Sequence, residues 1–502
     1  MKKKKNTDLL ELQRRLTEVA HLSFIDGIVG WDQEVNMPEK GADVRAQASA
    51  ELSSIIHNKF IAIDHDGLLS RLHTAVLAKK LKGKDAVVVE ETWRSYERER
   101  KLPEALVREL AEVTSRAQIA WAQARAQNDF KRFLPYLQKI VLLKRKEAQC
   151  VGFKDSPYDA LLDTYEPGMT TAEATMILND LKDFLVPFLK ELLSKKKQKK
   201  VSQKGKFPQS VQEQFNRYIA ERIGFDFKAG RLDASTHPFT SGTHPFDVRI
   251  TTRYKEDDLW YALGSTIHEV GHALYEQGLP HEHFGSPLGE AISLGIHESQ
   301  SRLWENHVGK SKAFWSHFYP KLQKEFPVPY KKIPLNDFYR LINDVKPSLI
   351  RTEADEVTYN LHIIIRFEIE REMIEGSIEL KDLPKIWQSK VKEYLGIDVP
   401  SDALGCMQDV HWSAGLVGYF PTYSFGNLYA AQLYATLQKD IPAVEKLMAK
   451  GSFSEIREWL RTHIHRMGKT YGASALIQKV TGEPLNSRYF AEYLKKKYTT
   501  LS

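Results

Sequence analysis

The sequence predicts a mainly α-helical protein, and three observations lead to that fold class. Apolar residues recur at three- and four-residue spacing through most of the 502 residues, as on one face of a helix. Alternating, β-branched stretches are rare; the clearest is 246–252, and 230–233 could pair with it. The composition, 42% hydrophobic and 27% charged, is typical of a globular chain. We therefore expect one large helical domain over residues 1–502, with a small antiparallel sheet near residues 225–255.

The helical segments follow one another along the chain. Residues 7–25 carry the first apolar stripe, in which Leu9, Leu12 and Leu16 lie three and four positions apart. Similar patterns occur at about 43–62, 105–126, 130–150, 171–194, 257–278, 287–308, 336–346, 356–376, 383–395, 425–438 and 453–463, and two more begin near 472 and 487. Proline and glycine mark the breaks between them. No internal repeat or clear linker divides the chain, which favours a single domain.

The positive charge is concentrated in two short segments. The net charge is +7, but four lysines stand at positions 2–5 and seven more between Lys195 and Lys206. Without these eleven lysines the net charge would be −4. Like charges in a row repel one another, so we expect residues 194–206 to form an exposed loop. Aromatic residues and recognisable nucleic-acid modules are missing around them, and we expect no nucleic-acid partner.

The sequence does not have the features of a secreted or membrane-spanning protein. Its two cysteines, Cys150 and Cys406, are far apart, which fits a reducing compartment. Charged residues from Asp8 onward interrupt the first apolar residues, so no signal peptide is expected. No run approaches the roughly 18 apolar residues of a membrane span. We expect a cytoplasmic protein with no membrane partner.

The strongest functional motif is His268-Glu269-Val270-Gly271-His272, an HExxH sequence within the predicted helix 257–278. Histidines four positions apart lie one turn apart on the same helix face. Both imidazoles can therefore bind one Zn²⁺ at about 2.0–2.1 Å. Glu269 can then act as general base toward a water at the metal.

A catalytic zinc site also needs a third protein ligand and an open position. Glu298, twenty-six positions after His272, lies in the next predicted helix and could return beside the two histidines. The competitors in the same region are His281, His283, Glu290 and His297. We expect His281 and His283 to lie in a loop. Glu290, about two turns before Glu298 on a similar face, is the main rival, and the spacing alone leaves this choice open.

Five further motifs occur in the order in which one peptidase family carries them. They are HPF at His237-Pro238-Phe239, DxRxT at 247–251, HESQ at 297–300, IRxxAD at 350–355 and GxxQDxHW at 405–412. With HExxH, they resemble the HExxH-type metallocarboxypeptidases, metallopeptidase family thirty-two. Matches such as Gly30-Trp31-Asp32 extend the resemblance over nearly the whole chain, with no departure at a motif position.

The resemblance implies more than the spacing does. It favours Glu298 over Glu290 as third ligand, with one Zn²⁺ per chain; Co²⁺ would suit the same ligands. It implies a metallocarboxypeptidase catalytic domain with a gluzincin, neurolysin-like fold and a long deep groove. It also implies a homodimer that removes C-terminal amino acids one at a time, with broad side-chain tolerance, from peptides with a free C-terminus.

An exopeptidase must bind a terminal carboxylate, and the planar fork of arginine matches that group. The candidates are Arg249 and Arg351, of which the resemblance favours Arg351; each could instead form a structural ion pair, with Asp247 and Asp355 respectively. The candidates for stabilising the oxyanion are His237, His411 and Tyr423. The candidates for orienting a metal-binding histidine from behind are Asp409 and Asp355.

Two alternative functions stay open at this point. A related helical gluzincin that cuts inside oligopeptides would share the metal site but would not need an anchor for the C-terminal carboxylate. A non-catalytic peptide-binding homologue would be expected to have lost Glu269 or a metal ligand, whereas all four residues are present.

Overall fold

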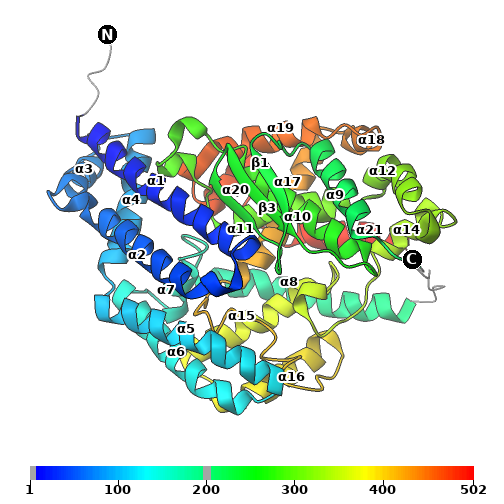
Figure 1. Ribbon diagram of the computed structural model, residues 1–502, viewed down its shortest axis with the longest axis horizontal. Helices are drawn as coiled ribbons and strands as arrows, with labels where there is room; N and C mark the ends of the chain where they lie inside the picture. The colour runs from blue at the N-terminus through cyan, green and yellow to red at the C-terminus, as the bar shows by residue number, and fades with distance from the viewer. Residues whose placement is uncertain (1–6, 196–204, 502) are drawn as a thin grey trace, which may run out of the picture.

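The computed structural model describes residues 7–195 and 205–501, and it is almost entirely helical (Figure 1). The helices of the first half are α1 (Thr7–Val35), α2 (Ala42–Ile61), α3 (Leu68–Leu77), α4 (Lys84–Arg100), α5 (Glu104–Gln127), α6 (Phe130–Val151), α7 (Pro157–Leu162), α8 (Thr171–Lys195) and α9 (Gln209–Ile223). Those of the second half are α10 (Leu259–Glu276), α11 (Leu294–Arg302), α12 (Lys312–Glu325), α13 (Pro327–Tyr330), α14 (Leu335–Ile342), α15 (Tyr359–Glu375), α16 (Leu383–Leu395), α17 (Pro421–Asp440), α18 (Val444–Ala449), α19 (Ser454–His463), α20 (Ala473–Thr481) and α21 (Arg488–Leu501). The predicted fold class is therefore confirmed.

Some helices differ from the predicted segments. The periodicity did not single out α3, α4, α9 or α12, whose sequences mix apolar and charged residues. The predicted helix 287–308 is divided: a short turn at Pro287–Gly289 comes first, and α11 begins only at Leu294. Its start is set by Ser293, whose side chain accepts a hydrogen bond from the backbone N–H of Ile296. After Arg302 the chain continues as a π-helical segment, Leu303–Gly309.

The small sheet lies where it was predicted, but it is mixed rather than wholly antiparallel. Its strands are β1 (Gly230–Ala234), β2 (Thr240–His244) and β3 (Asp247–Thr252), in the order β1-β3-β2. The predicted pairing of the first and last strands is present, yet β3 runs parallel to β1 and antiparallel to β2. The reason is β2, which the sequence did not reveal. The chain reverses both before and after β2, so β3 runs in the same direction as β1.

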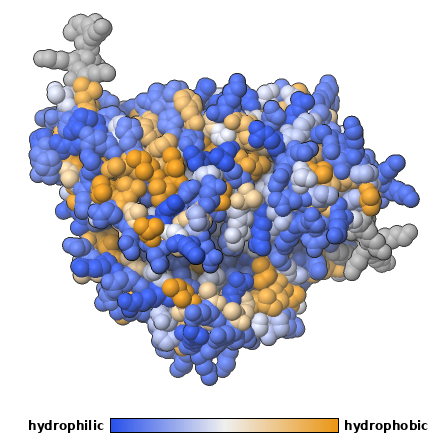
Figure 2. Space-filling view, in the orientation of Figure 1, coloured by the Kyte–Doolittle hydropathy of each residue, from blue (hydrophilic) through white to orange (hydrophobic). Residues whose placement is uncertain are grey.

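Two apolar clusters stabilise the arrangement. The larger includes Val248 and Ile250 of β3 and extends through α10, α11, α15 and α17. The smaller one joins α1, α3 and α4 around residues such as Leu12, Leu69 and Leu72. Figure 1 shows these N-terminal helices together at one side of the molecule. Apolar residues also gather at the surface over α1 and α2 (Figure 2), where Ile25 and Val44 are exposed.

Two other sequence predictions concern the Lys-rich segment and membrane-spanning helices. Most of the Lys-rich segment falls on residues 196–204, outside the described part of the chain, while the flanking Lys195 and Lys206 are exposed. Among residues 7–195 and 205–501, no helix combines the length and apolar character needed to cross a membrane.

Candidate metal centre

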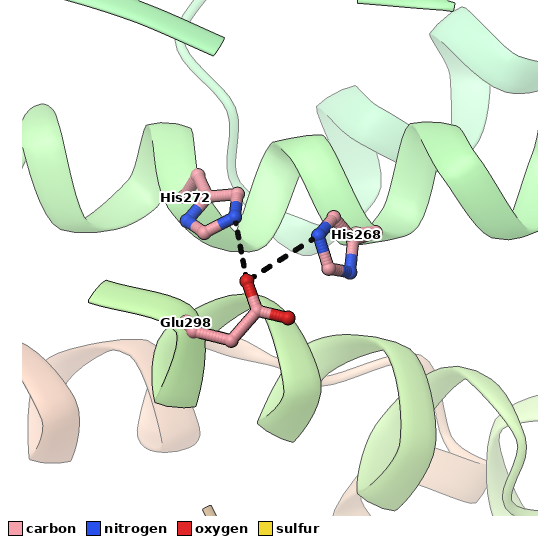
Figure 3. A group of neighbouring side chains, drawn as sticks. All are labelled: His268, His272 and Glu298. Carbon is pink, nitrogen blue, oxygen red and sulfur yellow. Dashed lines mark ion pairs between the residues drawn. The ribbon is translucent and has the colours of Figure 1, made fainter. Parts of the chain in front are cut away.

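Helix α10 holds the two HExxH histidines in fixed positions. Asp258 caps its first turn by accepting a hydrogen bond from the N–H of Tyr261. The side chains of Leu263, Ile267 and Val270 are at most 1% exposed and anchor one face of the helix in the core. His268 and His272 therefore point from the adjacent face toward α11 (Figure 3).

The three predicted metal ligands meet between α10 and α11. Oε2 of Glu298 lies 3.3 Å from Nε2 of His272 and 3.7 Å from Nε2 of His268. Ligand atoms bound tetrahedrally to zinc at about 2.0–2.1 Å are separated by about 3.3 Å, so the donor spacing fits that metal. These side chains form a group that could hold a metal ion. Glu290, the rival ligand, is exposed and forms an ion pair with Lys469 instead.

Two glycines allow this close approach of the helices. A Cβ on Gly271 would lie 2.5 Å from Cα of Ser301 and 2.7 Å from the carbonyl oxygen of Gln300, both backbone atoms of α11. A Cβ on Gly426 of α17 would overlap the side chain of Glu298. Glycine at both positions therefore lets α11 carry Glu298 close to the histidines of α10.

Hydrogen bonds on the far side of each imidazole orient the two histidines. Nδ1 of His268 lies 2.9 Å from a carboxylate oxygen of Glu305, and Nδ1 of His272 lies 2.6 Å from Nδ1 of His297. Both Nε2 atoms are thereby left facing Glu298. Sequence reasoning missed Glu305 because it lies in the π-helical segment, where regular helical spacing does not predict which side chains share a face.

The surroundings of His272 and Glu298 favour the metal-binding forms of these two side chains. Burial lowers the pKa of His272 to about 3, so its imidazole is neutral. Burial by itself raises the pKa of Glu298, but Arg302 and the two histidines outweigh it and keep the carboxylate ionised. Nε of Arg302 donates to Oε1 of Glu298 at 2.6 Å, which leaves Oε2 for a metal. Sequence reasoning did not identify Arg302.

Glu269, the predicted general base, is 6% exposed and lies beside the sheet. The hydroxyl of Thr240 in β2 donates a hydrogen bond of 2.6 Å to its Oε2. Burial raises the pKa of this carboxylate above its usual range. Thr240 was not predicted either, because nothing in a sequence links a residue of an unrecognised strand to a helix 29 positions later.

A second polar cluster surrounds Arg351. The residue is 6% exposed, and its guanidinium donates hydrogen bonds to Asp409 at 3.0 Å and to the hydroxyl of Tyr359 at 3.1 Å. Arg366 also donates to Asp409, at 2.7 and 2.5 Å. The ring of Tyr359 in turn stacks under the guanidinium of Arg302 at 4.3 Å, which joins this cluster to the metal centre.

Asp409 and Asp355 do not play the predicted part. The expectation that Asp409 orients a metal-binding histidine is wrong, because its two carboxylate oxygens accept hydrogen bonds from Arg351 and Arg366. Asp355 instead accepts from the backbone N–H groups of Val357 and Thr358 and so closes a turn before α15. The partners of Asp355 are set by the local turn. Those of Asp409 are set by packing between segments far apart in the sequence.

The remaining candidates divide into two groups. His411 and Tyr423 lie near Arg351: Nε2 of His411 is 3.4 Å from the Tyr423 hydroxyl, and the guanidinium of Arg351 is 5.0 Å from the Tyr423 ring. Arg249 forms the structural ion pair with Asp247, at 2.8 and 3.0 Å. His237 is exposed in the segment between β1 and β2.

A cavity of about 540 Å³ adjoins the centre. His297 forms part of its wall together with Tyr165 and Ser293, and α4 supplies Arg94 and Arg98. Since His297 touches His272, this cavity lies one side chain away from a candidate metal ligand.

Comparisons with known proteins show similarity to metallopeptidases. A family model described as "Carboxypeptidase Taq (M32) metallopeptidase" matches residues 11–498. The chain is 41% identical to "Thermostable carboxypeptidase 1" of Thermus thermophilus, over 98% of each chain, and 39% identical to "Carboxypeptidase 1" of Bacillus subtilis, over 97% of each. Its fold is similar to the crystal structure of an M32 carboxypeptidase from Deinococcus radiodurans, with a TM-score of 0.95, 36% identity and 99% of each chain covered.

Proposed function

The chain belongs to the carboxypeptidase Taq (M32) family of metallopeptidases, and from that premise we propose that it is a zinc-dependent carboxypeptidase. It would release C-terminal amino acids one at a time from peptides with a free C-terminus, with broad tolerance for the side chain released. His268, His272 and Glu298 would hold one zinc ion per chain, because His₂Glu is a common ligand set of catalytic zinc sites.

One observation carries the proposal of exopeptidase activity: a buried cationic cluster is joined to the metal centre. Arg351 and Arg366 share the single carboxylate of Asp409, so these three side chains carry a net charge of +1. Two hydrogen bonds fix the Arg351 guanidinium, which prepares it to receive a second carboxylate at little entropic cost. The stacking of Arg302 on Tyr359 connects this position with Glu298.

Each residue then has a defined task in the proposed reaction. Zinc, when bound, supplies Lewis-acid chemistry, activating a water molecule and polarising the scissile carbonyl. Thr240 holds one oxygen of Glu269, and the carboxylate takes the proton of the attacking water and passes it to the leaving amine. Arg351 binds the terminal carboxylate. Burial raises the pKa of Tyr423, so its phenol stays protonated and can donate a hydrogen bond to the oxyanion.

The test compares one peptide in two forms, with a free and an amidated C-terminus. Mass spectrometry of the zinc-loaded protein should show a ladder of single-residue losses from the free acid and no cleavage of the amide. Internal cleavage of the amidated peptide would identify the endopeptidase alternative instead. Glu269→Gln should bind zinc at the same stoichiometry and lose activity by about 10²–10⁴-fold.

A substitution of Arg351 tests whether this residue binds the C-terminal carboxylate of the substrate. Arg351→Gln should raise KM for free-acid peptides, with zinc content unchanged. The matched control is Arg253→Gln, because Arg253 is an exposed arginine beyond β3 whose hydrogen bond goes to the backbone of Thr236. Equal kinetics of the two variants would remove Arg351 from this role.

Three finer expectations complete the proposal. Elemental analysis of the purified protein would distinguish zinc from cobalt, which suits the same ligands. Light scattering would test the homodimer that family resemblance implies. A cytoplasmic location, with peptides rather than nucleic acids or membranes as partners, is consistent with the sequence composition and would be tested by fractionation.

A further inference from the structure

We propose that His297 and Glu276 are positioning residues that act in series to fix the tautomer and orientation of His272. The inference rests on the proposed metal site, since it concerns how a metal ligand is held. Helix α11 thus contributes Glu298 as a ligand and His297, the residue before it, as the support of another ligand. In the sequence His297 was a rival for the third ligand position; the structure gives it a different task.

The proton positions follow from two distances. Nδ1 of His272 lies 2.6 Å from Nδ1 of His297, and Nε2 of His297 lies 2.7 Å from Oε1 of Glu276. Two ring nitrogens can form a hydrogen bond only if one carries a proton and the other offers a lone pair. If His272 binds a metal through Nε2, its single proton must be on Nδ1. Nδ1 of His297 is then the acceptor, and its Nε2–H donates to the carboxyl group of Glu276.

This arrangement favours one tautomer at each histidine. When Nε2–H of His297 donates to Glu276, the neutral tautomer of His297 has its lone pair on Nδ1, toward His272. His272 must in turn donate from Nδ1, which leaves the lone pair of Nε2 toward Glu298, 3.3 Å away. The series therefore supports the form of His272 that can bind a metal.

The surrounding structure keeps Glu276 and His297 in place. Glu276 lies four residues after His272 on α10, so both side chains project from one face of the helix. Gly242 of β2 packs directly against the Glu276 carboxyl group, and a Cβ there would overlap it. The ring of Tyr275 lies 5.1 Å from that of His297. These contacts come from β2, α10 and α11 together.

The two metal-binding histidines are thus supported in different ways. His268 meets the carboxylate of Glu305 directly, at 2.9 Å. His272 meets the imidazole of His297, and a carboxylate only beyond it. A direct carboxylate neighbour increases the basicity of a ligand more than a neutral ring does. We therefore expect removal of His297 to disturb the orientation and tautomer of His272 more than its charge.

The test measures zinc affinity by competition with a chelator, so it does not depend on peptidase activity. His297→Leu removes the acceptor for His272 and should weaken zinc binding by about ten- to a hundredfold. His297→Asn keeps an acceptor, the side-chain oxygen, close to the position of Nδ1, and should restore most of the affinity. Glu290→Gln, at an exposed acid of the same segment, is the control and should bind zinc like the unmodified protein.

A double-mutant cycle tests whether Glu276 acts through His297. Glu276→Leu alone should weaken zinc binding, but in the His297→Leu background it should have no further effect. Additive losses would overturn the serial arrangement, and unchanged affinity in His297→Leu would overturn the positioning role. Absorption spectra of the cobalt-loaded variants report the ligand geometry, which should change in His297→Leu and return in His297→Asn.

Failure of the inference and failure of the proposed function give different results. If the unmodified protein binds no zinc or cobalt, the proposed metal site is wrong. If it binds metal and hydrolyses peptides while His297→Leu retains full affinity, only the inference is wrong. Thermal unfolding of the metal-free variants identifies any that fail to fold, and in that event His297→Asn and His297→Gln decide the question.

Discussion

The close contact at Gly271 leads to a prediction that joins packing to metal binding. In Gly271→Ala the new Cβ would stand 2.5 Å from Cα of Ser301. Ordinary contacts between carbon atoms are about 3.5–4.0 Å, so α11 would have to move by about 1 Å. The position of the new Cβ is fixed by the backbone of α10, and it meets backbone atoms of α11, so no side-chain rotation can relieve the contact.

The magnitude follows from the same distances. Metal–ligand distances tolerate changes of about 0.2 Å, so a shift of about 1 Å takes Glu298 out of reach of a metal on the two histidines. We expect zinc affinity to fall at least about tenfold, which corresponds to about 1.4 kcal/mol. Alanine is a better helix former than glycine by about 1 kcal/mol, but overpacking costs about 1–3 kcal/mol, so the metal-free protein should also lose stability.

The assay is chelator competition for zinc, together with thermal unfolding of the metal-free protein. Gly264→Ala is the matched control, because Gly264 lies in the same helix and the atoms nearest to its added Cβ belong to the indole of Trp260, the first at 2.8 Å. That side chain can move, so metal affinity should be unchanged. Normal zinc affinity in Gly271→Ala would refute the argument that this glycine sets the distance between the ligands.

Three further predictions concern the general base Glu269, the metal ion and the buried carboxyl group of Glu370. Thr240→Val removes the hydrogen bond to Glu269 and should lower kcat by about tenfold at unchanged zinc affinity. Thr240→Ser keeps the hydroxyl and should retain most of the kcat. Equal kcat in both variants would exclude the orienting role of Thr240. Zinc at a hundred times its Kd should stabilise the protein by about 2.7 kcal/mol, and a chelator should lower the melting temperature accordingly. Burial raises the pKa of Glu370 from 4.5 to about 7. Between these values the carboxyl group is protonated in the folded state and ionised in the unfolded state, so its contribution to stability falls by about 2.5 kcal/mol as the pH rises from 5 to 8. In the metal-free protein, urea unfolding should show that Glu370→Gln is less destabilising at pH 8 than at pH 5 by that amount, and a pH-independent difference would contradict the raised pKa.

The helical fold could be predicted because its signal is local. The apolar stripes that mark α1, α6 and α10 depend on spacings of three and four residues, and these spacings do not change with the rest of the fold. The sheet was harder to predict, because the direction of β3 depends on β2, whose residues Thr-Ser-Gly-Thr-His have no clear strand pattern. Strand pairing is decided between segments rather than within one.

The sequence by itself determined the pair of histidines and the base between them. His268, Glu269 and His272 keep their relation because one helical turn fixes it, whatever surrounds the helix. It also supplied Glu298 and Arg351 as candidates, and family resemblance favoured them over Glu290 and Arg249.

Only the tertiary structure decided which side chains meet this helix. Glu298 rather than Glu290 faces the histidines because α11 begins at Leu294, after the cap at Ser293, and packs against Gly271. Asp409 holds Arg351, 58 positions away, instead of a histidine, and Thr240 reaches Glu269 from a strand. The physical reason is that positions within a helix depend on backbone geometry, whereas contacts between elements depend on how the whole chain packs.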